Sequence, residues 1–290
     1  MSTKNLQKQQ LSKKESSEKK SYSNSHTLVK RELLGIGITN TTEESVLEFL
    51  KNSLQSGSEN YYIVTPNPEM IVLATKNADF KKALNGAKIA LNDGVGLLLA
   101  AKFMGRPLSE RITGVDFVKR VCEMSNDWPI TVGFLGGGPK IAEMTVECLV
   151  AEYPQLHVVY VNSEWNNDGF GKAKKYQVLG SKYYANEKKI RDTKYIIHNT
   201  SLIDVLFVAF GAPKQELFMA EHLNKIPVRV MVGVGGSFDY ISGSVKRAPV
   251  WVRNSGLEWL FRLIHQPWRF RRQLALVEFM WLVMLSRLFL

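Results

Sequence analysis

Short apolar runs recur along the chain, and each is followed by a longer stretch in which apolar residues return every three or four positions. The short runs fit buried strands, and the longer stretches fit helices with one apolar side. This alternation predicts an α/β fold with a Rossmann-like, mostly parallel sheet flanked by helices. We expect strands at 33–38, 61–64, 88–91, 130–135, 157–161, 205–210 and 228–234, and helices near 42–56, 68–85, 115–126, 139–152 and 213–225.

Five of the predicted strands end in turns that are rich in Gly, Pro, Asn or Asp. In an open parallel sheet such turns gather at one edge, and ligands bind there. Glycine lets a ligand approach the backbone, and the first N–H groups of a helix attract phosphate. Together the turns predict a site for a phosphate-bearing small molecule. They are TPNPE (65–69), NDG (92–94), GGGP (136–139), GAPKQE (211–216) and GGSFD (235–239).

The sequence lacks the motifs of several other chemistries. The glycine-rich turn at 136–138 does not have the G-x-G-x-x-G spacing of a dinucleotide site, and no P-loop, H-E-x-x-H or G-x-S-x-G motif occurs. The sequence also has no Asp-x-Asp pair that could hold a divalent ion. If the chain transfers a sugar from a nucleotide, the leaving group is a diphosphate. We expect Arg, Lys and helix N-termini to neutralise its charge, without a metal ion or a cofactor.

Charge is concentrated at the two ends of the chain. The net charge is +11; residues 1–31 hold eight Lys or Arg and two Glu, and residues 246–290 hold the same numbers, so each end carries +6 and the middle carries −1. A nucleic-acid enzyme more often has a basic groove through its core, so nucleic acid is not an expected partner. Basic ends beside apolar residues instead indicate an anionic membrane surface. The two cysteines, Cys122 and Cys148, fit a reducing compartment.

Composition divides the chain into three parts. Residues 1–31 are polar and rich in Lys, which predicts a disordered basic tail. Residues 32–245 form the predicted α/β core, with a surface insertion at about 163–184 where Gly, Asn and Lys follow no clear period. Residues 246–290 form a predicted helical appendage at the carboxyl end.

The appendage has the pattern of amphipathic helices. Within 255–265, Leu257, Leu260 and Ile264 share one helical face, and charged residues lie on another. The last apolar run, 274–290, is short for a membrane span and carries charges. We therefore expect it to form an interfacial, membrane-binding helix, with a true span or a helix packed on the core as the alternatives.

The turn motifs, read in order, resemble those of the WecG/TagA/CpsF family of bacterial glycosyltransferases. The similarity covers most of residues 33–273, and the departures from it are the Lys-rich leader and the insertion. The combination of NDGVG, GRPLSERITG, GAPKQE and GLEWLFRL is highly specific. The matching stretches are TPNPEM (65–70), LNDGVGLLLAAKFMGRPLSERITGVDF (91–117), VGFLGGGP (132–139), DVLFVAFGAPKQE (204–216) and VGVGGSFDYISGSVKRAPVWVRNSGLEWLFRLIHQPWRFRRQ (232–273).

The resemblance implies an inverting transferase that moves N-acetylmannosamine, or a related sugar, from UDP to undecaprenyl-diphospho-N-acetylglucosamine. The product would enter wall teichoic acid or another surface polysaccharide. Such an enzyme is expected at the cytoplasmic face of the bacterial plasma membrane as a peripheral protein. The resemblance also suggests Asp93 as the catalytic base, with Thr65 and Asn67 as its neighbours in the active site.

Further residues near these turns are candidates for holding substrate. Arg106 and Arg111 follow the expected base, and a guanidinium is a bidentate partner for diphosphate. Ion pairs, helix caps and plain tight turns remain the structural interpretations of these residue types. The other donor-binding candidates are Gly136, Gly137, Gly138, Lys214, Gln215, Glu216 and Asp239, and the candidates for lipid phosphate or acceptor diphosphate are Arg262, Arg269, Arg271 and Arg272.

A second function class fits the same features. A non-catalytic protein that binds nucleotide sugars and assembles other glycan enzymes at the membrane would keep both the cleft and the basic end. The substitution Asp93→Asn separates the two hypotheses, because it would abolish transfer and leave a purely binding function intact.

Overall fold

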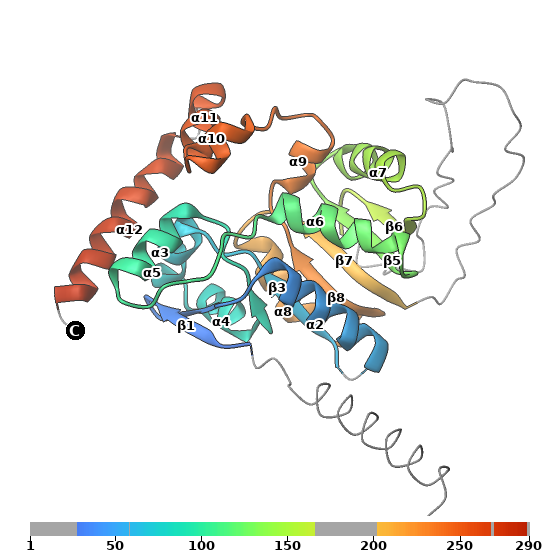
Figure 1. Ribbon diagram of the computed structural model, residues 1–290, viewed down its shortest axis with the longest axis horizontal. Coiled ribbons are helices and arrows are strands. Elements are labelled where there is room, and N and C mark those ends of the chain that lie inside the picture. Colours follow the sequence, from blue (N-terminus) through green and yellow to red (C-terminus); the bar gives the residue numbers. More distant parts are fainter. Residues whose placement is uncertain (1–27, 58, 166–201, 268–269, 289–290) are drawn as a thin grey trace, which may run out of the picture.

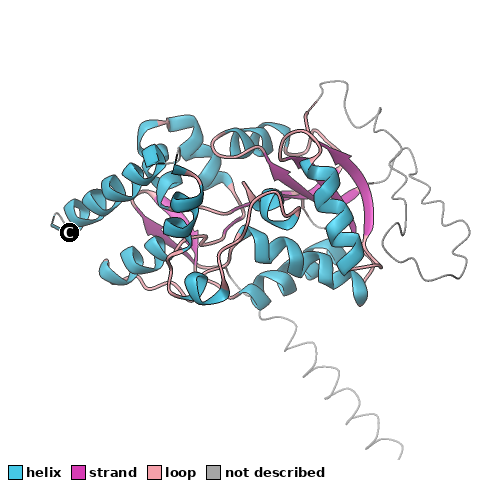
Figure 2. Cartoon of the chain, turned by 90° about the horizontal axis from the view of Figure 1, so that it is seen from above, coloured by secondary structure: helices cyan, strands magenta, loops and turns pink. Residues whose placement is uncertain are grey.

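The computed structural model describes residues 28–57, 59–165, 202–267 and 270–288. At its centre lies a parallel six-stranded sheet with the strand order β4-β3-β8-β7-β5-β6. Helices cover both faces of the sheet, so the predicted α/β fold is confirmed (Figures 1 and 2). The strands are β3 (Tyr61–Val64), β4 (Ile89–Ala90), β5 (Thr131–Gly136), β6 (His157–Asn162), β7 (Ile203–Ala209) and β8 (Val228–Gly233).

Successive residues of the central strands face opposite sides of the sheet. In β7, Val205 and Phe207 belong to one hydrophobic cluster, whereas Leu206 and Val208 belong to the other. Both faces are buried, which explains why the strands read as uninterrupted apolar runs. The first face is covered by α2 (Glu43–Ser56), α6 (Gly114–Glu123), α7 (Ile141–Glu152) and α9 (Ser237–Ile241), and the second by α3 (Pro68–Lys76), α4 (Ala78–Gly86), α5 (Val95–Phe103), α8 (Lys214–His222) and α12 (Phe270–Leu288).

The structure differs from the predicted elements in two places near the amino end. The single strand expected at 33–38 is wrong, because the chain reverses there and forms the antiparallel hairpin of β1 (Lys30–Leu33) and β2 (Ile36–Thr39). The turn uses left-handed backbone at Leu34 (φ 51°) and Gly35 (φ 80°). The single helix expected over 68–85 is also wrong.

That helix is divided into α3 and α4 at Asn77. The Asn77 backbone is extended (φ −135°), and its side chain accepts a hydrogen bond from the N–H of Phe80, so it caps α4. An Asn that bonds to the backbone two or three residues ahead competes with continuous helix, which is the physical reason for the break. The helix α5, which follows Asp93, was not among the expected elements.

The carboxyl end forms three helices beside the sheet edge: α10 (Val250–Asn254), α11 (Glu258–His265) and α12. Phe279 and Val283 of α12 are buried in the core, and Glu278 pairs with Lys76 of α3 at 2.7 Å. The opposite side of α12 is exposed, so this helix packs on the core through one face and leaves a second apolar face uncovered. Among the described residues, no helix has the length and apolarity that crossing a membrane requires.

Two expectations fall largely outside the described residues. Of the predicted tail at 1–31, the structure describes only 28–31, and of the insertion at about 163–184 it describes only 163–165. Trp165 packs edge-on against Phe218 of α8, with ring centroids 5.0 Å apart.

Candidate active site

A cleft of about 1250 Å³ opens at the carboxyl edge of the sheet. The structure brings the five predicted polar turns together in it, and the segment after β6 joins them. The helices α11 and α12 line its other side, and Figure 1 shows α12 next to α3 and α5. The lining residues at the strand ends are Thr65 and Asn67, Asp93 and Gly94, Gly137 and Gly138, Ser163, Gly211, and Gly235 and Gly236.

Asp93 lies between β4 and α5, at the wall of this cleft. Its backbone N–H donates to the carbonyl of Pro66 at 3.0 Å, which ties the β4 turn to the β3 turn. Burial raises the pKa of the carboxyl group to about 6, although the charge of Arg111 and the N–H of Gly114, 3.5 Å from Oδ2, act in the opposite direction. A carboxylate whose pKa lies near neutrality is suited to accept a proton.

Arg111 connects the cleft to the carboxyl-terminal helices. Its Nη2 donates to Oε2 of Glu258 at 2.6 Å, and its Nη1 donates to the carbonyl of Arg253 at 3.4 Å. The side chains of Arg111 and Glu258 are 20% and 17% exposed, so this ion pair is largely shielded from water. Arg111, in the segment between α5 and α6, therefore contacts the first residue of α11 directly.

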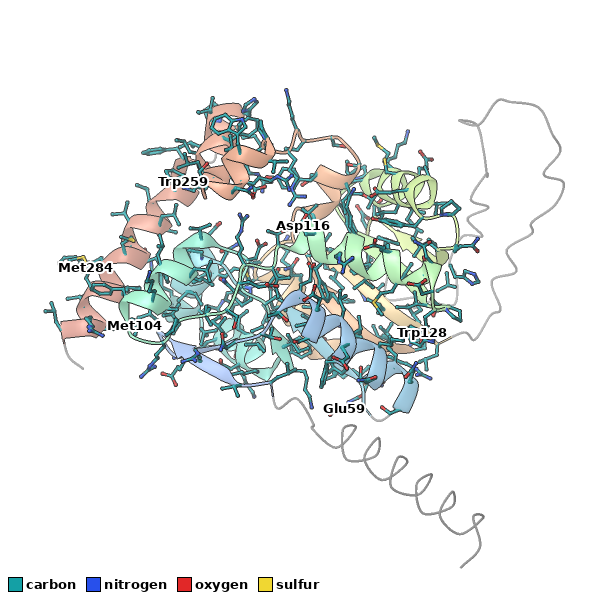
Figure 3. All side chains as sticks on the ribbon, in the orientation of Figure 1. Glu59, Met104, Asp116, Trp128, Trp259 and Met284 are labelled. Atoms are coloured by element: carbon teal, nitrogen blue, oxygen red, sulfur yellow. The ribbon has the colours of Figure 1, made fainter. Side chains whose placement is uncertain are left out.

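A second arginine network stands next to this pair. Arg247 donates from both Nη atoms to Asp116 of α6, at 2.7 and 2.8 Å, and its Nε lies 3.7 Å from Glu258. Burial alone would raise the pKa of Asp116, but the hydrogen bonds from Arg247 and Thr113 lower it. In Figure 3, Asp116 lies at the end of α6 that faces the carboxyl-terminal helices.

These arginines retain unused donors. The Nε atoms of Arg111, Arg247 and Arg253 are buried and have no hydrogen-bond partner among the described residues. Buried guanidinium groups with unmade hydrogen bonds favour an anion, because phosphate oxygens can satisfy them in pairs. Sequence reasoning assigned no role to Arg247, Arg253 or Glu258, although all three lie within the matched stretch 232–273.

Thr65 and Asn67 both line the cleft, and each is also engaged in the fold. The hydroxyl of Thr65 donates to the carbonyl of Gly233 at 2.9 Å, which links the ends of β3 and β8. The side chain of Asn67 accepts from the N–H of Met70 at 3.0 Å and caps α3. Asn67 is therefore a helix cap at the cleft wall.

Three glycines at the strand ends leave the cleft floor open. Gly138, Gly211 and Gly235 have left-handed φ values of 87°, 75° and 54°. A Cβ atom built on any of them would meet no atom within 4 Å. Gly136, by contrast, does not line the cleft, because it packs against the backbone of Ala209.

Gln215 holds two of these turns in place. Its Oε1 accepts from the N–H groups of Gly211 at 3.2 Å and Gly235 at 3.0 Å, and its Nε2 donates to Oε1 of Glu216 at 2.7 Å. Glu216 is fully buried behind the cleft and does not line it, and burial raises its pKa to about 7. Lys214 is exposed at the start of α8 and lines the cleft.

Arg262 of α11 lies in the cleft, where its guanidinium stacks over Tyr240 at 4.9 Å from the ring centroid. An added Cβ on Gly236 would lie 3.2 Å from its Nη2 and 3.3 Å from Oδ2 of Asp239. Arg262 therefore shares one corner of the cleft with the β8 turn and Asp239.

Arg106 is not brought to this site, and the side chains of the last three candidate arginines fall outside what the structure describes. Arg106 is separated from the cleft, because its Nη1 donates to the carbonyl of Glu32 in the β1–β2 hairpin at 3.0 Å. Arg269 lies outside the described residues, as do the side chains of Arg271 and Arg272 in the first turn of α12.

No cluster of three or more His, Cys, Asp or Glu suited to a metal ion occurs in the part of the chain that the structure describes. Those residues bring together one carboxylate of raised pKa, several arginines and open glycine turns. With the Rossmann-like sheet behind them, they form a cleft that has the features of an enzyme active site.

The chain belongs to the WecG/TagA/CpsF family of glycosyl transferases, whose family model matches residues 31–290. It is therefore a glycosyltransferase of the hexosyl-transferring type. Three relatives are each named N-acetylglucosaminyldiphosphoundecaprenol N-acetyl-beta-D-mannosaminyltransferase. The protein of Bacillus spizizenii (strain W23) is 30% identical over 235 residues, which cover 81% of this chain and 83% of that protein. That of Bacillus subtilis (strain 168) is 28% identical over 84% and 87% of the two chains, and that of Staphylococcus aureus (strain MW2) is 28% identical over 87% and 91%.

Proposed function

We propose that this chain transfers N-acetylmannosamine, or a related sugar, from UDP to the N-acetylglucosamine of undecaprenyl-diphospho-N-acetylglucosamine, with inversion at the anomeric carbon. The names of its relatives support both the transferred sugar and the lipid-linked acceptor. The observation that carries the proposal is the position of Asp93 in the cleft, beside Arg111 and the β3 turn.

The reaction needs one base. As an acceptor hydroxyl oxygen forms its bond to the anomeric carbon, the bond to the UDP oxygen breaks, and UDP leaves with the electron pair. The hydroxyl proton passes to Asp93, which is ionised at pH 7 because its pKa is about 6. Proton transfer to a positioned carboxylate contributes about 10²–10⁴-fold to the rate. Thr65 and Asn67 keep the neighbouring turn in place through their bonds to Gly233 and Met70.

The leaving diphosphate needs positive charge. Arg111, Arg247 and Arg262 all line the cleft, and the buried Nε–H groups of the first two find no hydrogen-bond acceptor in the described part of the chain. Planar guanidinium groups bind phosphate oxygens in pairs, and Lys214 adds a charge at the α8 end. The open glycines at 138, 211 and 235 give the nucleotide room against the backbone. We expect transfer without a metal ion.

The acceptor is anchored in a bilayer, so the cleft must reach a membrane surface. We propose that α10, α11 and α12 bind that surface peripherally, at the cytoplasmic face, with their basic residues near lipid phosphates. Large apolar side chains are exposed along these helices, and such a contiguous patch is typical of an interaction surface. They include Val250, Trp251, Trp259, Ile264, Phe270, Leu274, Val277, Met280, Trp281 and Met284.

The test uses the full chain with UDP-N-acetylmannosamine and a short-chain lipid-diphospho-N-acetylglucosamine, with product mass and linkage as readouts. Asp93→Asn should reduce transfer by at least about 10²-fold while UDP-sugar binding persists. Asp79→Asn, at an exposed position of α4, is the matched control and should leave transfer unchanged. Unaltered transfer by Asp93→Asn would overturn the assignment of Asp93 as the base. Binding of the UDP-sugar by the unmodified chain without any transfer would favour the non-catalytic alternative. Addition of EDTA checks the expected metal independence.

A further inference from the structure

The cleft has two chemically different limbs. One holds Asp93 and the arginines, whereas the other runs between α3, α5 and α12 and is lined mainly by apolar side chains. Diphosphate oxygens and sugar hydroxyls need hydrogen-bond donors and acceptors, and aliphatic side chains supply neither. We call this second limb the α3–α12 groove; the residues that line it are Met70 and Leu73 of α3, Val95 and Leu99 of α5, and Leu274, Val277 and Met280 of α12.

The groove leaves large apolar side chains in contact with water. Leu99 is 62% exposed, Leu274 is 53% exposed and Val277 is 69% exposed. Removing aliphatic side chains of this size from water is favourable, so the groove has an unused capacity to bind an apolar ligand. The polar side chains that α3 and α12 add to the described lining are Glu69 and Gln273, whereas the arginines lie in the other limb.

The groove is continuous with the exposed face of α12. Phe270, Leu274, Val277, Trp281 and Met284 recur at intervals of three or four residues, so they form one stripe along the helix. The first three line the cleft, and the last two lie beyond it. In Figure 3, Met284 points outward from α12. An apolar chain that enters the groove from the catalytic end can therefore leave along the helix without crossing a polar barrier.

We propose that the α3–α12 groove binds the first isoprene units of the acceptor lipid while its diphosphate lies at the arginines and its sugar lies at Asp93. The inference rests on the proposed function, which it deepens by assigning the lipid tail a site on the protein. Its distinguishing consequence is that the tail contributes to binding without any membrane. A tail held by the bilayer alone would contribute nothing to binding in solution.

The experiment measures binding of N-acetylglucosamine-diphosphate acceptors that carry an ethyl group or one, two, three or four isoprene units. The full chain is titrated by calorimetry without vesicles or detergent, below the concentration at which the ligands aggregate. Kd should fall at least about tenfold over the first two units and then level off as the groove fills, with a binding heat capacity that grows more negative. A Kd independent of tail length would overturn the inference.

Substitutions in the groove test whether it causes the dependence of Kd on tail length. Leu274→Ser and Val277→Ser should raise Kd for the three-unit ligand at least about tenfold and leave Kd for the ethyl ligand unchanged. Met144→Ser is the matched control, because Met144 of α7 is an apolar side chain with 40% exposure that does not line the cleft. Equal effects of all three variants would place the tail outside the groove and overturn the inference.

Transfer, measured in parallel, separates the two proposals. If the chain catalyses transfer but its Kd does not depend on tail length, the proposed function stands and the groove does not bind the tail. If Kd depends on tail length but no acceptor receives the sugar, the groove is a lipid-binding site and the proposed reaction is wrong.

Discussion

Glu258, the first residue of α11, accepts a 2.6 Å hydrogen bond from Arg111 of the segment between α5 and α6. The two residues are 147 positions apart in the chain, and the pair joins the carboxyl-terminal helices to the segment that follows Asp93. The same carboxylate lies 3.7 Å from Nε of Arg247. One acidic side chain thus compensates two of the arginines on which the proposed diphosphate site depends.

The first prediction concerns this carboxylate. Glu258→Ala should lower the free energy of unfolding by about 1.5–3 kcal/mol, because it leaves the largely buried Arg111 without its charged partner. Glu278→Ala is the control, since the Glu278 side chain is 39% exposed and its pair with Lys76 is worth less than about 1 kcal/mol. Urea unfolding of both variants measures the difference. Equal losses would show that the Arg111 pair adds nothing beyond a surface contact.

The second prediction concerns the pH dependence set by Asp93. Because the base must be ionised, kcat/KM should rise with pH through about 6 and then level off. The folded pKa lies above the unfolded value of 3.8, so the native state holds the proton more tightly. The stability that this group contributes is therefore present below about pH 4 and is lost as pH rises through 6.

Asp93→Asn should remove both effects, since an amide does not titrate. Relative to the unmodified chain, the variant should gain stability as pH rises from 5 to 8. Urea titrations at both values, with Asp79→Asn as the reference, measure this difference. If the unfolding free energies of Asp93→Asn and the unmodified chain differ by the same amount at pH 5 and at pH 8, the pKa of Asp93 is not raised.

The third prediction separates capping from catalysis at Asn67. Asn67→Ala should cost about 1 kcal/mol of stability, because the N–H of Met70 loses its acceptor. Asn67→Ser retains a cap and should restore that stability. If Asn67 also contacts substrate, transfer by the Ser variant stays low although its unfolding curve is normal. Full activity of the Ser variant would reduce Asn67 to a helix cap.

Local signals account for what the sequence predicted well. Pro68 after Asn67, and Gly94 after Asp93, are short-range features that mark a helix start and a turn whatever surrounds them. Because strand ends of a parallel sheet share one edge, the sequence alone was enough to place the turns together. The three glycine turns were placed at the site for the same reason.

Long-range pairing accounts for what was missed. Arg247 meets Asp116 across 131 positions, and Glu258 meets Arg111 across 147, so no local pattern reveals either pair. Arg106 was expected beside the diphosphate because it is close to Asp93 in sequence, but the β1–β2 hairpin supplies its partner, the Glu32 carbonyl. That hairpin turns at Leu34, a residue type that rarely takes positive φ.

The fourth prediction concerns the glycine floor of the cleft. Gly138→Ala adds a methyl group that meets no protein atom and so projects into the proposed nucleotide site. We expect KM for the UDP-sugar to rise about tenfold or more, with a strain cost of about 1 kcal/mol from φ 87°. Gly243→Ala carries the same strain at φ 75°, has equally open surroundings and lies outside the cleft lining. Similar KM values for the two variants would place the nucleotide elsewhere.

The last prediction concerns Glu216, the buried acid behind Gln215. Its Oε1 accepts from Nε2 of Gln215, which fixes the amide so that its oxygen receives the N–H groups of Gly211 and Gly235. Burial raises the pKa of Glu216 to about 7, so its stabilising contribution holds at low pH and fades as pH rises through 7. Above that pH the carboxylate carries buried charge, and its Oε2 has no hydrogen-bond partner among the residues that the structure describes, which loosens the two turns.

Glu216→Gln keeps an acceptor for Gln215 and cannot ionise. We expect it to hold KM for the UDP-sugar constant from pH 6 to 8.5, whereas KM of the unmodified chain rises over that range. Its unfolding free energy should also exceed that of the unmodified chain at pH 8.5 and not at pH 6. Glu221→Gln, at an exposed position of the same helix, should change neither quantity. If the Glu216 and Glu221 variants follow the same pH profile, Glu216 does not position the turns, and Gln215 holds Gly211 and Gly235 without its help.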